Sequence, residues 1–289
     1  MTTLRRESPA KVNLTLRVTG VRADGFHELE SLVALVDFCD TVTVSKRADD
    51  QVQVACDDPA IPCDASNLAH RAATRLAEVT GAGRGADITL TKRIPAGAGL
   101  GGGSSNAATT LALLNELWET NLSDAELARI GASIGSDVPL FFSGPLCVLR
   151  GRGEQVERIY QRLRAWIVLI LPGIHCSTPE VYRGWDKLSD HPPRPVLAEV
   201  LSALDRPHAL MRSLFNDLEA PVLALEPMLA EAFSDLVALR DGPVRMTGSG
   251  SALYCLFRDE EAANAFAQAA TDNVGLPAIA TCIVPAEDA

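Results

Sequence analysis

The sequence lacks the short motifs that mark several large enzyme classes. The dipeptide Gly-Lys occurs nowhere, which excludes a Walker A phosphate loop. The His-Arg-Asp and Asp-Phe-Gly motifs of protein kinases are also missing. No two of the seven cysteines are spaced as Cys-x-x-Cys, and most lie in apolar surroundings, as in Leu-Cys147-Val. We therefore expect reduced, buried thiols in a cytoplasmic protein.

Long apolar segments are missing as well. The longest uncharged run, residues 94–115, contains five glycines and does not suit a membrane span. The basic residues near the start, Arg5 and Arg6, are not followed by an apolar run, so we expect no signal peptide. The 26 basic and 37 acidic residues give a net charge of −11. This charge argues against partners such as nucleic acid or an anionic membrane, but not against an anionic small substrate.

Alternating and helical patterns divide the chain into a mixture of strands and helices. Strands are expected at 11–18, 41–47, 51–55, 86–94, 165–171, 252–257 and 278–284, and Asp49-Asp50 predicts a hairpin between the second and third. Helices are expected at 66–80, capped by Ser66 and ended by Gly81, at 104–118, at 123–134, and over most of 197–239 and 259–270. Ser123 and Glu126 form a capping box.

The length of 289 residues allows one large or two medium domains. We place a boundary near residue 160, which gives an N-terminal domain over 1–160 and a C-terminal domain over 161–289. Composition does not shift there, so the boundary depends on the Gly-Arg-Gly-Glu segment before it.

The most informative segment is a glycine-rich loop before a predicted helix. Five glycines lie among the seven residues from Gly97 to Gly103, and Ser104 and Ser105 follow. Such a loop can approach a ligand closely, and the N–H groups at the start of the helix favour an anion. The segment therefore predicts a phosphate site.

Two other interpretations of this loop explain the sequence less well. A plain turn with a serine cap does not explain five glycines, each of which costs up to about 1 kcal/mol relative to alanine. Gly97-x-Gly99-x-x-Gly102 matches the dinucleotide fingerprint of an oxidoreductase. That fingerprint requires a strand after the helix, whereas a second helix is predicted here.

The loop, Pro-x-Gly-x-Gly-Leu-Gly-Gly-Gly-Ser-Ser, resembles the second motif of the GHMP kinases. Residues 8–14 (SPAKVNL) resemble their first motif and residues 247–251 (TGSGS) their third. Residues 20–29, 135–139, 177–182 and 216–219 resemble the members that act on a cytidine diphosphate-linked sugar alcohol. The resemblance is collinear from residue 8 to about 285 and implies an α+β fold of two domains, an ATP-binding N-terminal domain and a ferredoxin-like C-terminal domain, with the active site in a cleft between them.

The resemblance implies an ATP-dependent small-molecule kinase. ATP would be held by the loop residues Pro95, Ala96, Gly97, Ala98, Gly99, Leu100, Gly101, Gly102, Gly103, Ser104 and Ser105. Two bound polyphosphates would require Mg²⁺, with Ser105 as a candidate ligand and the other ligands unassigned. The expected assembly is a monomer or a homodimer. Another GHMP kinase, of the homoserine or mevalonate type, and a non-catalytic nucleotide-binding protein of the same fold are the alternatives.

Lys11 and Asp137 are the catalytic residues that the resemblance implies, with Asp137 as the general base. From spacing alone, Asp137 fits a residue that ends a helix equally well, and Lys11 fits a solvated strand edge better.

The resemblance also implies five substrate contacts. His27 would read the cytosine edge, Phe26 and Tyr182 would stack on the base, and Asn13 and Thr178 would orient the rest of the substrate. From the residues alone, Phe26 and Tyr182 also fit a core, and TGSGS fits a tight turn. Phe26 stands where this family commonly has tyrosine, so stacking would survive but a hydroxyl contact would be lost.

Overall fold

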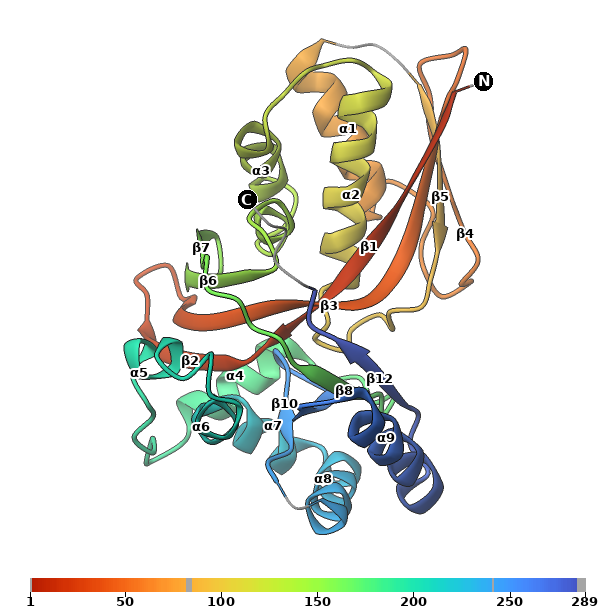
Figure 1. The fold of residues 1–289 in the computed structure, drawn as a ribbon. Helices are drawn as coiled ribbons and strands as arrows, with labels where there is room; N and C mark the ends of the chain where they lie inside the picture. Colours follow the sequence, from red (N-terminus) through yellow and green to blue (C-terminus); the bar gives the residue numbers. More distant parts are fainter. Residues whose placement is uncertain (1, 82–84, 241, 285–289) are drawn as a thin grey trace. The chain divides into compact units, whose positions relative to one another are not determined.

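The computed structural model describes residues 2–81, 85–240 and 242–284 (Figure 1). The chain forms two compact units that interleave along the sequence. The first contains Met1–Ala10, Phe38–Ala96 and Gly101–Gly144, and the second contains Lys11–Asp37, Gly97–Leu100 and Pro145–Ala289. These units do not follow a linear split at residue 160, because strands β1 (Thr3–Asn13) and β3 (His27–Lys46) each contribute to both. The domain boundary itself stays a prediction.

The sheet of the first unit corrects the predicted hairpin. Strand β4 (Val52–Cys56) does not pair with the end of β3; it runs parallel to β5 (Ala86–Thr91). Strand β5 in turn pairs antiparallel with residues 41–46 of β3 and so lies between the two segments that were expected to pair. The reason is the connection between β4 and β5, which contains a helix and allows parallel pairing.

Three helices pack together in this unit: α1 (Leu68–Thr80), α2 (Gly102–Leu117) and α3 (Asp124–Ala132) (Figure 1). Their apolar faces bury a core with the sheet that includes Val42, Leu76, Ile88, Leu111, Leu114 and Trp118. Helix α1 is capped by Asn67, whose side chain accepts from the Ala69 N–H at 2.9 Å, and not by the predicted Ser66. Gly81 ends the helix with φ +66°, as expected.

The second unit contains two groups of strands. The first half of β3 pairs with β2 (Thr15–Val21) and β6 (Leu146–Gly151), and β6 also pairs with β7 (Gln155–Arg158). Strand β9 (Phe215–Asn216) runs parallel to β2. A separate antiparallel sheet has the order β10 (Arg245–Met246), β11 (Leu253–Phe257), β8 (Trp166–Ile170) and β12 (Ala278–Cys282).

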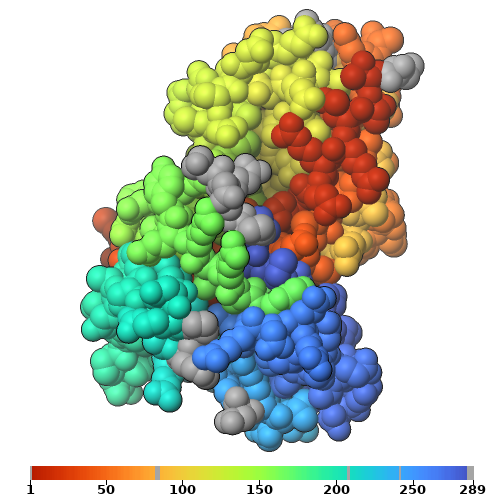
Figure 2. All heavy atoms as spheres, viewed as in Figure 1, coloured from red at the N-terminus to blue at the C-terminus, as the bar shows by residue number. Residues whose placement is uncertain are grey.

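Helix α9 (Glu260–Val274) packs on strands β8 and β12 of this sheet (Figure 1). The expected helical region 197–239 is confirmed as α5 (Leu197–Leu201), α6 (Pro207–Ser213), α7 (Glu219–Leu225) and α8 (Pro227–Leu239). Helix α4 (Thr178–Asp186) packs against α7. The segment around α5, coloured teal, is visible at the surface of the unit, where Glu199 and Ser202 are exposed (Figure 2).

The cysteines are mostly buried, as the sequence predicts. Cys39, Cys147, Cys176 and Cys255 are buried, whereas Cys63 is exposed. Burial raises the pKa of the Cys147 thiol to about 12 and that of Cys255 to about 11. These two thiols therefore stay protonated at neutral pH. Separately, no helix in the described part of the chain has the length and apolar character needed to cross a membrane.

A buried polar network fastens both ends of the glycine loop within the first unit. The Asp40 carboxylate, which is fully buried, accepts from the N–H groups of Arg93 and Ile94 at 2.7 and 2.8 Å. It also pairs with the Lys92 ammonium and accepts from Asn106 Nδ2 at 3.0 Å. Residues 92–94 lead into the glycine loop, and Asn106 belongs to helix α2, which follows the loop. The Asp40 carboxylate therefore connects the segment before the glycine loop to the helix after it.

Removing this carboxylate should destabilise the protein strongly. In Asp40→Ala, the buried Lys92 ammonium would lose its anionic partner, and two main-chain N–H groups would lose their acceptor. We expect a loss of about 3–5 kcal/mol in the free energy of unfolding, measured by urea titration. The control is Glu116→Gln, which removes a half-exposed pair with Arg6 and should change the value by no more than about 1 kcal/mol. Equal losses in both variants would contradict the role given to Asp40.

Candidate active site

The glycine loop adopts the left-handed backbone that its composition predicts. Gly97, Gly99 and Gly101 have φ values of +69°, +77° and +70°. At Gly99 a side chain is also excluded by space, because a Cβ atom would lie 2.4 Å from the Thr247 carbonyl oxygen. Position 99 therefore requires glycine for two reasons: its backbone is left-handed, and the Thr247 main chain leaves no space for a side chain.

Residues 97–100, which belong to the second unit, are tied to its main chain. The Lys11 N–H donates to the Leu100 carbonyl at 2.9 Å, and the Ala252 N–H donates to the Ala98 carbonyl at 3.1 Å. The side chains of Ala98 and Leu100 are buried. The carbonyls and side chains of these two residues are thus committed to the protein interior.

The third motif packs directly on this loop. A Cβ atom at Gly248 would lie 3.2 Å from the Gly99 carbonyl oxygen and 3.4 Å from Lys11 Nζ. The Gly248 backbone is also left-handed, with φ +57°. Segments 11–13, 97–100 and 247–251, which are far apart in the sequence, therefore meet within the second unit.

Lys11 is buried, which corrects the sequence-based preference for a solvated lysine. Its exposed fraction is 5%, and Nζ donates to Asn13 Oδ1 at 2.6 Å. Asn13 is held in turn, because its N–H donates to Thr247 Oγ1 at 2.9 Å and its Nδ2 donates to Ser31 Oγ at 2.8 Å. The Asn13 side chain therefore positions the ammonium group of Lys11.

Within the first unit, Gly135 lies close to the start of helix α2, two residues before Asp137. The N-cap residue of α2 is Gly101, so no cap side chain occupies the N–H groups of its first turn. A Cβ atom at Gly135 would lie 3.8 Å from Ser104 Oγ. Asp137 is half-buried two residues later, and its neighbours Val138 and Pro139 are buried at the start of the short helix η1 (Pro139–Phe142). The expected rigid turn at Val-Pro is present.

Ser105 lies in the buried network and not at the surface of the helix. Its exposed fraction is 0%, and its Oγ accepts from Ser8 Oγ at 2.8 Å. The Ser105 oxygen keeps a second lone pair beside the one that accepts from Ser8, but its burial makes this hydroxyl poorly accessible to a metal ion. The role of Ser105 as a metal ligand stays a prediction, and Ser104, which is partly exposed, has the more accessible hydroxyl.

A second group of predicted residues forms an aromatic cluster in the second unit. His27, at the start of β3, stacks on Tyr182 of α4 with ring centroids 4.6 Å apart. The edge of Trp185 approaches the His27 ring at 5.7 Å. His27 Nε2 is hydrogen-bonded to Asp186 Oδ1 at 2.8 Å. Tyr182 is thus partly buried against His27. It is neither fully in the core nor fully exposed, so its burial does not decide between the predicted roles of a core residue and a ring that stacks on the base.

The turn before His27 presents Phe26 at the surface. The Arg22 N–H donates to the Phe26 carbonyl at 2.7 Å, and the Phe26 N–H donates to Asp24 Oδ1 at 3.1 Å. This last bond, together with Arg22, holds the pKa of Asp24 below its usual range. The Phe26 ring is 54% exposed, and the guanidinium of Arg152 lies 4.9 Å from its centroid. Phe26 is therefore a surface platform and not a core residue.

Thr178 connects helix α4 to the third motif. Its hydroxyl is hydrogen-bonded to Ser249 Oγ at 2.7 Å, with either atom as donor. The residue is exposed at the first turn of α4. Within the second unit, Thr178 and Lys11 thus lie around one short turn, residues 247–251.

Several residues of this arrangement were missed from the sequence. Asp40 and Lys92 belong to none of the motifs recognised in the sequence. Lys92 lies three residues before Pro95, and a positive charge so near a predicted phosphate site could have indicated its importance. Asp186 follows Tyr182 by four residues and so shares its helix face. Arg152 belongs to the segment that was read only as a domain boundary.

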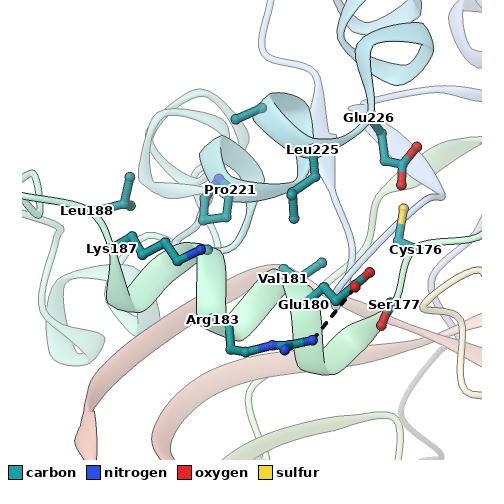
Figure 3. Close-up of a pocket in the computed structure, with 12 residues that line it drawn as sticks. Cys176, Ser177, Glu180, Val181, Arg183, Lys187, Leu188, Pro221, Leu225 and Glu226 are labelled. Carbon is teal, nitrogen blue, oxygen red and sulfur yellow. Dashed lines mark ion pairs between the residues drawn. The ribbon is translucent and has the colours of Figure 1, made fainter.

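Helix α4 also borders a groove on its other face (Figure 3). The groove has a volume of about 490 Å³ and lies between α4 and α7, with Val181, Gly184, Pro221 and Leu225 in its lining. Glu180 and Arg183 of the same helix form an ion pair at 3.7 Å at its edge (Figure 3). Tyr182 and Asp186 are not part of the lining, so the groove is separate from the His27 cluster.

Comparison with known families agrees with the three motifs. Residues 67–145 match the GHMP kinases N terminal domain, and residues 197–275 match the GHMP kinases C terminal family. The first matched segment contains the glycine loop and Asp137, and the second contains the third motif, residues 247–251.

Curated relatives and solved structures extend the match to most of the chain. Proteins named 4-diphosphocytidyl-2-C-methyl-D-erythritol kinase are 39% identical in a Geobacter species, over 91% of this chain and 92% of the relative, and 39% identical in Shouchella clausii, over 89% and 87%. A crystal structure titled 4-(cytidine 5'-diphospho)-2C-methyl-D-erythritol kinase has a TM-score of 0.83 at 35% identity and covers 97% of this chain and 99% of its own. A homoserine kinase from Cytophaga hutchinsonii shares the fold, with a TM-score of 0.75 at 18% identity over 100% and 96%. The chain therefore belongs to the GHMP kinases and, among them, to the family of the 4-diphosphocytidyl-2-C-methyl-D-erythritol kinases.

Proposed function

We propose that this kinase transfers the γ-phosphoryl group of ATP to the 2-hydroxyl of 4-diphosphocytidyl-2-C-methyl-D-erythritol, in the non-mevalonate route to isoprenoid precursors. The observation that carries the proposal is the meeting, within one unit, of Lys11, the loop 97–100 and the turn 247–251. The same unit contains the His27 cluster that the resemblance assigns to cytosine.

The glycine loop suits the polyphosphate of ATP. Its left-handed glycines leave no side chain between the main chain and a ligand, and α2 begins without a cap side chain. The loop residues from Pro95 to Ser105 would hold the phosphates mainly through N–H groups. Because main-chain groups have little freedom to move, such a site is preorganised for charge.

Magnesium fits the chemistry of the reaction. When bound, Mg²⁺ would neutralise charge on the β- and γ-phosphates, which is its usual task in phosphoryl transfer. The Ser104 hydroxyl is the accessible oxygen at the first turn of α2 that supports this assignment. Ser105 is fully buried beside Ser8 and would be the less accessible of the two hydroxyls.

Lys11 and Asp137 would carry the proton and the developing charge. Asp137 would accept the proton of the attacking hydroxyl as the new P–O bond forms and the bond to ADP breaks. The ammonium of Lys11 would stabilise negative charge on the transferring group. Support for Lys11 comes from its burial and its fixed partner Asn13, which a merely solvated lysine would not need.

The His27 cluster would select the nucleoside part of the acceptor. Phe26 offers an exposed ring for stacking, and Arg152 covers part of it. Tyr182 supports the His27 ring by stacking on it. Asn13 would act on the substrate through Lys11, and Thr178, paired with Ser249, would bind the diphosphate or the erythritol.

A parallel acceptor assay tests the proposal. ADP release is measured with 4-diphosphocytidyl-2-C-methyl-D-erythritol, homoserine and mevalonate, each at the same ATP and Mg²⁺ concentrations. We expect turnover with the cytidine compound only. Turnover only with homoserine or mevalonate would reassign the substrate, and ATP binding without turnover on any acceptor would indicate a non-catalytic protein.

Loss of either catalytic candidate should remove most of the activity. We expect Asp137→Asn to lower kcat by about 10²–10⁴-fold, the usual range for a proton-transfer group. We expect Lys11→Met to lower kcat by about 10²–10³-fold, the usual loss when one charge-stabilising donor is removed. Calorimetry should show that both variants still bind ATP. The matched controls are Asp50→Asn and Lys46→Met, which change exposed side chains and should leave kcat unchanged. Full activity in Asp137→Asn would contradict its role as base.

A side chain at Gly99 should disturb the loop, whereas one at Gly103 should not disturb the fold. In Gly99→Ala the Cβ atom meets the Thr247 carbonyl and the backbone stays left-handed, so we expect about 1–3 kcal/mol of destabilisation and weaker ATP binding. In Gly103→Ala the nearest atom is Leu68 Cδ1 at an ordinary 3.6 Å, and the helix should gain up to about 1 kcal/mol. Thermal unfolding compares the two, and equal stability would count against the packing described.

Phe26 should contribute to binding of the acceptor and not to chemistry. Because stacking of an aromatic ring on a base contributes about 1–3 kcal/mol, Phe26→Ala should raise the KM of the cytidine substrate by about 5–150-fold. Phe26→Tyr should preserve the KM. Tyr160→Ala, which removes another exposed ring, serves as the control and should have no effect. A changed kcat with an unchanged KM would exclude the stacking role.

A further inference from the structure

The contact between His27 and Asp186 restricts the histidine to one tautomer. His27 Nε2 lies 2.8 Å from Asp186 Oδ1, and a carboxylate can only accept a hydrogen bond. In neutral His27, the proton must therefore be on Nε2. The Nδ1 atom then has a free lone pair and acts as an acceptor, and within the described residues it has no hydrogen-bond partner.

The ring orientation is fixed as well as its protonation. Tyr182 stacks on one face of the ring and Trp185 meets it in a T-shaped contact, so tilting the ring plane would break both contacts. A half-turn within that plane would move Nε2 away from Asp186 and lose their hydrogen bond. The His27 side chain is 11% exposed, whereas Asp186 is 40% exposed. All three partners come from helix α4, with Tyr182 and Asp186 one turn apart on the same face. The helix thus presents an acceptor and a ring support together.

We propose that Asp186 is a specificity-determining positioning residue, which makes His27 Nδ1 an acceptor for the exocyclic amino group of cytosine. This inference rests on the proposed function, because it requires a cytidine substrate at His27. Cytosine carries a hydrogen-bond donor at position 4, whereas uracil carries an acceptor oxygen there. An acceptor at Nδ1 therefore favours cytosine and leaves two acceptors facing each other when uracil binds.

The kinetic test compares the cytidine substrate with its uridine analogue. In Asp186→Leu either tautomer becomes available, so we expect the preference in kcat/KM for cytidine over uridine to fall by about tenfold or more. The change should lie in KM and not in kcat, because the groups that act on the phosphoryl are untouched. Asp186→Glu, which keeps a carboxylate, should restore part of the preference. Glu180→Leu, an exposed substitution on the other side of α4, is the matched control.

A spectroscopic test reads the tautomer directly. Nitrogen-15 NMR of the imidazole side chains at mildly alkaline pH should show His27 protonated on Nε2 in the native chain. The chain has five histidines, so a His27→Gln variant assigns the signal by its loss. In Asp186→Leu we expect a mixture of the two tautomers.

The outcomes separate this inference from the proposed function. Proton on Nδ1 in the native chain, or an unchanged cytidine preference in Asp186→Leu, would overturn the role of Asp186. Absence of turnover with the cytidine substrate would overturn the proposed function. In that case, calorimetry of CDP and UDP binding to the native chain and to Asp186→Leu still tests the inference. If the ratio of the CDP affinity to the UDP affinity is the same in both proteins, the inference is rejected.

Discussion

Main chain packed directly against main chain is the constraint on which the candidate site depends. At Gly99 and Gly248 the two backbones approach so closely that neither residue can carry a side chain without displacing the other segment. Lys11 is drawn into the same contact, since its N–H binds the Leu100 carbonyl and its ammonium lies beside Gly248. A site built this way has few rotatable bonds, which favours a fixed array of N–H groups over an adaptable one.

The buried polar groups of the first unit complete this rigidity. Asp40 receives hydrogen bonds from two main-chain amides, an ammonium and an amide side chain, so its charge is compensated without water. Such a fully paired network is costly to break at any single member and therefore specifies one arrangement. The network holds residues 92–94, before the glycine loop, and helix α2, after it, without occupying the loop itself.

The local features of this fold could be predicted from the sequence, and the non-local ones could not. Gly81 and the glycine loop have conformations that depend on the residues themselves, and both predictions are confirmed. The pairing of β4 with β5 depends on a segment thirty residues away, so the turn at Asp49-Asp50 predicted the wrong partner. Lys11 is likewise buried in contact with Leu100 and Gly248, which are distant in the sequence, and no pattern around residue 11 reveals it. The role of Asp186 could not be predicted either, because its contact with His27 exists only in the folded chain.

The proposed function assigns recognition of phosphate and recognition of the acceptor to different parts of the chain for a physical reason. Main-chain N–H groups bind any polyphosphate and cannot tell one base from another, because every residue supplies the same group. In the proposed function, the side chains of Phe26, His27, Tyr182 and Asp186 discriminate between acceptors. Substitutions in that cluster can change the acceptor while the loop and its packing stay the same. The fold itself is shared with a homoserine kinase at 18% identity, so the backbone arrangement leaves most side chains free to differ.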